Sequence, residues 1–158
     1  MKTLYKIYLV LFIALLFFSS CTMSKYVVSN SANIEKYKYA SISEVMGYTG
    51  SPKLMDMDVQ IFNIVASSDL EMIGEKEISN LSKEEQNALL LVKYSATQSK
   101  EESGISITFV DYLTLRPIAT CKGVSGLGLN ESHDMRIALK KAQEQVKKLF
   151  NKIDKTKG

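Results

Sequence analysis

The sequence contains no tryptophan, one histidine and two cysteines among its 158 residues, and these scarcities exclude several kinds of site. With Cys21 assigned to another role below, a single thiol and a single imidazole remain, too few to complete a four-ligand zinc site. Cys121 then has no disulfide partner within the chain, and an unpaired cysteine of this kind is typically a small buried strand residue. We therefore predict no metal site, no cofactor and no intramolecular disulfide.

An excess of either charge is also lacking. The formal net charge is +3, and it falls to +1 when Lys2 and Lys6 of the leader described below are removed. Nucleic-acid binding requires a strong basic surplus, so the sequence predicts no nucleic-acid partner. There is no internal repeat and no low-complexity tract, and the length that remains after the leader suits one domain with a single core.

The first 21 residues have the order of a secretory leader. Two lysines precede the run Ile7–Phe18, which is apolar except for the Tyr8 hydroxyl, and Ser19-Ser20-Cys21 follows directly. This order predicts a signal peptide with a cysteine at its cleavage site. It resembles the lipobox of bacterial lipoproteins, in which the cysteine thiol receives a diacylglycerol and becomes the first residue of the mature chain. Phe18 stands where that motif usually has leucine, but it is also large and apolar.

Two other interpretations of this segment stay open, an uncleaved anchor and an ordinary cleaved signal. The twelve-residue apolar run is shorter than the roughly 20 residues that cross a bilayer as a helix, which favours a leader. Thr22 follows the cysteine, whereas Asp at this position retains proteobacterial lipoproteins in the inner membrane. The resemblance therefore implies the outer membrane of a Gram-negative bacterium. No acidic export stretch follows in residues 22–25, which favours the periplasmic face.

The remaining chain divides into a lipidated tether at 21–33, one α/β domain at 34–153 and a basic tail at 154–158. Within the tether, Tyr26-Val27-Val28 could add a short strand. Alternating or β-rich runs predict strands at 37–42, 70–74, 89–96, 105–112 and 117–124. Ser82 and Glu85 form a capping-box pattern that predicts a brief helix before the third of these strands.

Two long amphipathic helices complete the prediction. The first begins at Ser51-Pro52 and carries an apolar stripe, although residues 59–65 could alternatively form a strand. The second spans 131–153 with an apolar seam, capped by Asn130 or Ser132. The stripe residues are Met55, Val59, Phe62 and Ala66 in the first helix, and Met135, Leu139, Ala142, Val146, Leu149 and Ile153 in the second. We therefore predict an α+β two-layer sandwich, in which both helices cover one face of a mixed sheet of four or five strands.

The sequence carries few groups that could act in catalysis. His133 lies between Ser132 and Asp134, but residues adjacent on a helix diverge and cannot align as a triad. The glycine-rich turn before the last helix is a candidate binding surface, formed by Gly123, Gly126, Gly128 and Asn130. It matches neither phosphate-loop pattern, and glycines there also serve a sharp turn. Glu71, Glu75 and Glu77 are expected to face solvent.

A longer resemblance covers most of residues 34–150. A strand ending at Asp111 is followed by a turn, the strand Pro117-Ile118-Ala119-Thr120, the glycine-rich exit and a closing helix over 132–150. This outline, with Ile34–Ala40 and Met72-Ile73-Gly74 before it, resembles a module of small Bacteroidota-like envelope lipoproteins. Related architectures occur in lipoprotein activators of penicillin-binding proteins and in amino-terminal domains of TolB-like proteins. Arg116-Pro117 departs from the Thr-Gly turn of that pattern.

The resemblance implies an adaptor with no catalytic residues, so we predict a protein that is not an enzyme. It would be anchored at Cys21 and would bind an envelope protein or the peptidoglycan machinery through the open sheet face, a strand edge or the glycine-rich turn. Two alternatives are an enzyme that uses carboxylates on envelope glycans and a structural subunit of an envelope assembly. The sequence predicts no particular oligomeric state.

Overall fold

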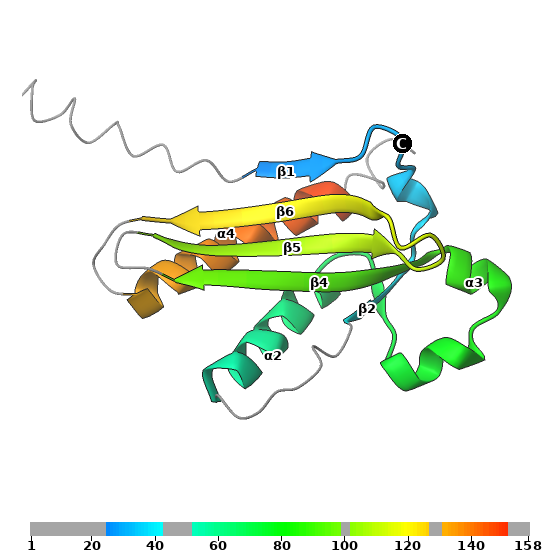
Figure 1. Cartoon of the computed structure of the whole chain (residues 1–158), viewed down its shortest axis with the longest axis horizontal. Helices are drawn as coiled ribbons and strands as arrows, with labels where there is room; N and C mark the ends of the chain where they lie inside the picture. The colour runs from blue at the N-terminus through cyan, green and yellow to red at the C-terminus, as the bar shows by residue number, and fades with distance from the viewer. Residues whose placement is uncertain (1–24, 43–51, 99–101, 127–130, 152–158) are drawn as a thin grey trace, which may run out of the picture.

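The computed structural model describes residues 25–42, 52–98, 102–126 and 131–151. A mixed six-stranded sheet forms one layer and two long helices form the other (Figure 1), which confirms the predicted α+β class. The predicted leader at 1–20, the lipidation site Cys21 and the tail at 154–158 lie outside the described residues. Within the described residues, no helix has both the length and the apolar composition needed to cross a bilayer.

The sheet has the spatial order β1-β6-β5-β4-β2-β3. The elements are, in chain order, β1 (Lys25–Val28), the 3₁₀ helix η1 (Ile34–Lys36), β2 (Tyr39–Ile42), α2 (Pro52–Ala66), β3 (Glu71–Met72), the 3₁₀ helix η2 (Glu75–Asn80), α3 (Lys83–Asn87), β4 (Leu89–Gln98), β5 (Ser103–Asp111), β6 (Pro117–Ser125) and α4 (Glu131–Phe150). The pairs β1–β6, β6–β5 and β5–β4 are antiparallel, whereas β2 runs parallel to both β4 and β3.

The sheet has one strand more than the upper limit predicted, because β1 lies in the segment assigned to the tether. Its residues pair with β6 from Lys25↔Lys122 to Val28↔Ala119. The tether assignment is therefore wrong for residues 25–28, and the short strand that the sequence left open is observed. The sequence Tyr-Val-Val favours strand pairing, and without β1 the outer edge of β6 would be unpaired.

The central hairpin β5–β6 agrees with the predicted alternation. Ile105, Ile107, Phe109 and Asp111 are each at most 4% exposed and share the side that faces the helices. Cys121 lies opposite Ile107 on that side and is fully buried, and desolvation raises the pKa of its thiol to about 12. At neutral pH this thiol is protonated and is a packing residue of the core.

Helix α4 packs directly on β5 and β6 through the predicted seam. The five seam residues from Met135 to Leu149 are buried, whereas Ile153 lies outside the described residues. Phe150 extends the contact by meeting Phe109 edge to face, with ring centroids 4.8 Å apart. The helix backbone lies close to the sheet above Gly123, where an added Cβ would lie 1.9 Å from the Ala138 carbonyl oxygen.

Helix α2 is present, but its predicted buried stripe is wrong. Val59 and Phe62 are 60% and 46% exposed, Ala66 is also exposed, and the Met55 side chain is outside the described set. The helix packs instead through Ile61, Ile64 and Val65, toward α4 and β3. Since α2 carries apolar residues on two of its faces, periodicity alone could not select the one that meets α4.

Replacing Gly123 by alanine should destabilise the fold, because the new methyl group would collide with the backbone of α4. We expect Gly123→Ala to lower the free energy of unfolding by at least about 2 kcal/mol, measured by urea denaturation. Gly74→Ala is the matched control, since its Cβ would meet only the flexible Glu77 side chain, at 3.2 Å. Equal stabilities for the two variants would contradict the close approach of α4 to β6.

Candidate functional site

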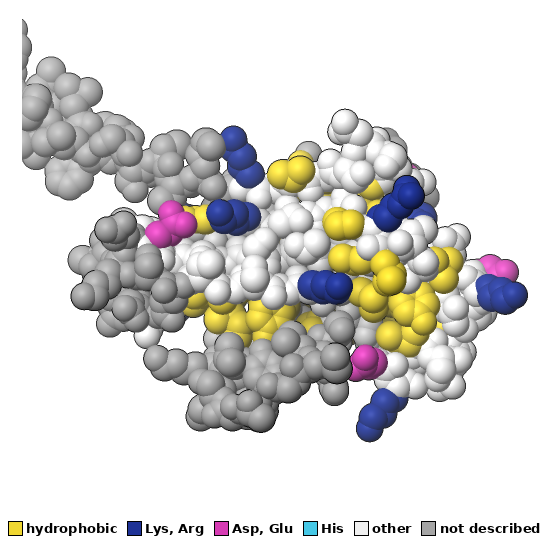
Figure 2. All heavy atoms as spheres, viewed as in Figure 1, with side chains coloured by type: hydrophobic (Ala, Val, Ile, Leu, Met, Phe, Trp, Pro, Cys, Tyr) yellow, Lys and Arg dark blue, Asp and Glu magenta, His cyan; other side chains and the backbone are white. Residues whose placement is uncertain are grey.

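The side of the sheet opposite α2 and α4, here called the open face, carries the candidate site. The strand registers place on this face Lys25 and Val27 of β1, Thr120 and Lys122 of β6, Ser106, Thr108 and Val110 of β5, Leu91, Lys93 and Ser95 of β4, and Ser41 of β2. Most of these side chains are polar, but one end of the face is apolar. Figure 2 shows hydrophobic side chains gathered at the end next to η2 and α3.

The segment 74–87 lies over this apolar end and is held by two capping interactions. The Gly74 backbone N–H donates to the Glu77 carboxylate at 3.1 Å at the start of η2. At the start of α3, the Ser82 N–H donates to the Glu85 carboxylate at 2.8 Å, and the Glu85 N–H donates to the Ser82 hydroxyl at 3.2 Å. This reciprocal pair is the predicted capping box, and it fixes where α3 begins within the segment 74–87.

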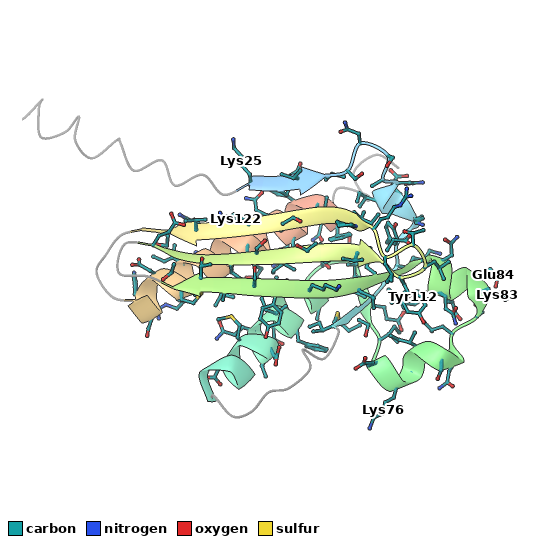
Figure 3. The ribbon with its side chains drawn as sticks, viewed as in Figure 1. Lys25, Lys76, Lys83, Glu84, Tyr112 and Lys122 are labelled. Atoms are coloured by element: carbon teal, nitrogen blue, oxygen red, sulfur yellow. The ribbon has the colours of Figure 1, made fainter. Side chains whose placement is uncertain are left out.

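A cavity of about 330 Å³ lies between the segment 74–87 and the sheet. Its walls come from three separate parts of the chain, namely β2, η2 and the β4–β5 pair, and the residues are Ser41, Glu75, Ile78, Ser79, Leu91 and Tyr112. Ile78 is only 8% exposed and anchors η2 against the sheet. Figure 3 shows Tyr112 at the end of the sheet beside η2 and α3. The lining residues combine apolar side chains with two serine hydroxyls, one tyrosine and one carboxylate.

Ser41 is the most informative residue of this cavity. Its side chain is 1% exposed, and its Oγ atom has no hydrogen-bond partner among the described residues. A buried polar group without a partner costs about 1–3 kcal/mol of stability, so such groups are rare in folded proteins. A ligand that enters the cavity with a polar atom would satisfy this hydroxyl.

The Asp111 carboxylate holds the wall of the cavity in place from the helix side of the sheet. It accepts hydrogen bonds from Lys36 Nζ at 2.9 Å, from the Tyr37 hydroxyl at 2.8 Å, and from the Thr114 N–H and hydroxyl at 2.8 and 2.9 Å. The next residue, Tyr112, donates its N–H to the Leu89 carbonyl at 3.2 Å and lies on the opposite side. The carboxylate thus joins η1, the end of β5 and the β5–β6 turn.

Burial and hydrogen bonding act in opposite directions on the Asp111 carboxyl. Desolvation alone would raise its pKa, but the hydrogen bonds from Lys36, Thr114 and Tyr37 outweigh it, and the pKa lies well below its usual range. The pKa of Tyr37 is raised, mainly by burial and then by its hydrogen bond to Asp111. Asp111 is therefore a carboxylate, and Tyr37 a neutral phenol, across the physiological pH range.

The glycine-rich turn is not a single exposed surface. Gly123 is buried beneath α4, so its assignment to a binding surface is wrong, and the glycine is required by the contact with Ala138. Gly126 is exposed, at the end of β6 away from the cavity. The other predicted residues of this surface, Gly128 and Asn130, lie outside the described residues, as does the lipidation site Cys21.

The other candidates from the sequence do not converge. The Asp134 carboxylate accepts from the Ser125 hydroxyl at 3.0 Å, and the Arg136 guanidinium contacts Nδ1 of His133 at 2.8 Å, so the local Ser-His-Asp sequence does not form a triad. Ser132 lies within α4 and not at its N-cap. The carboxylates at positions 71, 75 and 77 are exposed, as predicted. No cluster of three potential metal ligands occurs in the part of the chain that the structure describes.

Sequence reasoning missed Ser41, Ile78 and Leu91 as site residues, and it treated Tyr112 as an ordinary strand residue. Ser41 and Leu91 lie directly opposite each other on parallel strands separated by the whole of α2, β3, η2 and α3. No pattern within a short stretch of the sequence predicts that these two residues pair. The one available signal was Ser41 itself, a polar residue between the apolar Ala40 and Ile42 of β2.

Comparison with known proteins gives no family assignment. No family model matches the chain, and no curated protein sequence matches it. Among solved structures, PelC from Paraburkholderia phytofirmans, a dodecamer, is similar in two crystal forms, with 12% and 11% identity and a TM-score of 0.47 in each. These matches cover 81% of this chain and 99% and 96% of the PelC chains. At this level the similarity adds nothing to the fold described above, and no function is transferred from it.

The Asp111 network should make the fold sensitive to acid. Because the folded pKa is depressed, its stabilisation is complete above the unfolded value near 4 and is lost as the pH falls toward the folded value. We expect Asp111→Asn to cost about 2–3 kcal/mol at pH 7 and to flatten the fall in stability between pH 5 and 2, measured by urea denaturation at each pH. The exposed Asp69, replaced by asparagine, is the control. An unchanged pH profile in Asp111→Asn would refute this role.

Proposed function

We propose that the chain is a lipid-anchored lipoprotein of the outer membrane that acts as a non-catalytic binding module at the periplasmic face. Two features support this proposal. The leader Met1–Ser20 followed by Cys21 has the order of a lipoprotein signal, and the open face of the sheet carries a cavity next to exposed polar side chains. Its partner would be an envelope protein or a component of the peptidoglycan machinery, as the resemblance to envelope lipoproteins implies.

The observation that carries the binding role is the buried Ser41 hydroxyl, which has no hydrogen-bond partner among the described residues, in a cavity with apolar and polar walls. Binding sites commonly combine apolar walls with a few polar groups that fix the orientation of the ligand. Here Ile78 and Leu91 supply apolar wall, and the hydroxyls of Ser41 and Ser79 supply polar contacts. A partner side chain or a small ligand of matching shape would gain both kinds of contact in the cavity.

The enzymatic alternative is less well supported by the same cavity. Hydrolysis of a glycan by the common route uses two carboxyl groups on opposite sides of the bond, about 5–10 Å apart. Among the described residues that line the cavity, the single carboxylate is that of Glu75, on the exposed η2 segment. A second acid would have to come from outside these described lining residues for this chemistry to proceed.

The anchoring part of the proposal is tested by replacing Cys21 with alanine in the full-length chain. We expect the wild-type protein to incorporate labelled palmitate and to sediment with outer membranes, because the thiol is the acceptor of the lipid. Cys21→Ala should lose the label and the membrane association, whereas Cys121→Ala should keep both, since that thiol is fully buried. Labelling that persists in Cys21→Ala would refute lipidation at this residue.

The binding part is tested by site-specific photocrosslinking in living cells. A photoreactive residue at Ser79, which is exposed and lines the cavity, should give a discrete crosslinked product. The same residue at exposed Lys147 on α4 serves as the positional control. Filling the cavity by Ser41→Val should remove the Ser79 product and leave the melting temperature unchanged or raised, because it also removes an unpartnered hydroxyl. A Ser79 product that survives Ser41→Val would contradict binding in the cavity.

A further inference from the structure

Two lysines lie directly opposite each other on the open face, at the end of the sheet away from the cavity. The register pairs Lys25 of β1 with Lys122 of β6, and both side chains are exposed (Figures 2 and 3). Like charges directly opposite each other on antiparallel strands are destabilising. Neither lysine forms an ion pair with another residue in the described ranges, so this arrangement is not explained by a contact within the domain.

On the strands of this face the residues around the two lysines are uncharged or basic, and Figure 2 shows one acidic side chain at the same end of the sheet, near Lys122. At open-face positions of β1, β4, β5 and β6, no residue is an aspartate or a glutamate. The neighbours are two valines, three hydroxyl residues and a further lysine, namely Val27, Val124, Ser106, Thr108, Thr120 and Lys93. Glu102, just before β5, is the acid nearest in sequence to this end of the hairpin. The face therefore offers cationic and hydroxyl groups to an anion.

The position of Lys25 in the chain links this pair to the membrane. Four residue steps separate Lys25 from the proposed lipid-bearing Cys21, and a fully extended chain spans at most about 14 Å over that length. Attraction between lysines and an anionic lipid surface acts within about one Debye length, near 8 Å at physiological ionic strength. A lipidated Cys21 would thus keep the Lys25 backbone within about 14 Å of the anchor, from where its side chain, and that of Lys122 beside it, can reach the lipid headgroups.

We propose that Lys25 and Lys122 bind the phosphate groups of anionic phospholipids and fix the orientation of the domain on the bilayer. This inference rests on the lipid anchor proposed above. Both lysines lie about 13 Å along the strands from the cavity residue Leu91, and across the strands Lys122 is about 10 Å and Lys25 about 14 Å away from it. The cavity lies at the other end of the same face, displaced along and across the strands from the lysine contact.

The absence of tryptophan allows a direct test with one introduced reporter in the full-length lipoprotein. Val27→Trp places the indole beside the lysine pair, and Leu113→Trp places it at the opposite end; both positions are exposed, at 68% and 55%. The lipidated proteins are reconstituted into vesicles of phosphatidylglycerol and phosphatidylethanolamine that contain a brominated phospholipid as quencher. We expect strong quenching at position 27 and little at position 113.

Removing the charges of Lys25 and Lys122 should leave the domain anchored to the bilayer but no longer held in one orientation. In the Val27→Trp background, Lys25→Gln with Lys122→Gln should lower the ratio of docked to undocked domains by about tenfold, seen as a loss of quenching. Lys147→Gln with Lys148→Gln, which makes the same charge change on exposed α4 positions, should leave the quenching unchanged. Vesicles of phosphatidylcholine that contain the same proportion of brominated phospholipid but no anionic lipid should give weak quenching at both reporter positions.

The outcomes separate this inference from the anchor on which it rests. Failure of the wild-type protein to float with the vesicles would refute the lipid anchor. Flotation with equal quenching at positions 27 and 113 would overturn the orientation and assign the lysine pair to a partner other than lipid. Quenching that survives in the double lysine variant, with an unchanged melting curve, would show that the lysines do not bind the phosphates.

Discussion

The carboxylate of Asp111 is the interaction on which the geometry of the cavity end depends. It lies 4% exposed at the end of β5 and receives hydrogen bonds from residues 36, 37 and 114, which come from both sides of it in the sequence. Four donors to one buried charge compensate its desolvation, whereas fewer would leave a net cost. The network thereby fixes where β5 ends and where Tyr112 turns to the open face.

The fold separates two tasks on the two faces of one sheet. On the face under α4, the helix backbone lies directly against the strand at Gly123. The packing of α4 on this face buries many of the core residues. The opposite face carries hydroxyls and lysines, with a cavity at one end and the Lys25–Lys122 pair at the other. Stability is thus concentrated on one side, and the other side is left available for binding.

Sequence patterns predicted the elements whose signal is local. The α4 seam, the alternation of β5 and the Ser82–Glu85 capping box each involve residues within a few positions of one another, and each agrees with the structure. The buried face of α2 could not be chosen, because Val59 and Ile61 are equally apolar and the choice depends on α4. The cavity could not be predicted either, because Ser41 and Leu91 meet only through a parallel pairing across 50 residues of chain.

The short strand β1 also has a mechanical consequence. Its four residue pairs with β6 use hydrogen bonds that run perpendicular to the strand axis. A force applied to the chain before Lys25 and directed along β1 therefore acts on all of these bonds together, in shear, and does not open them one after another. A chain held at Cys21 would transmit tension from the bilayer to the domain through this edge strand, the part of the sheet best oriented to resist it.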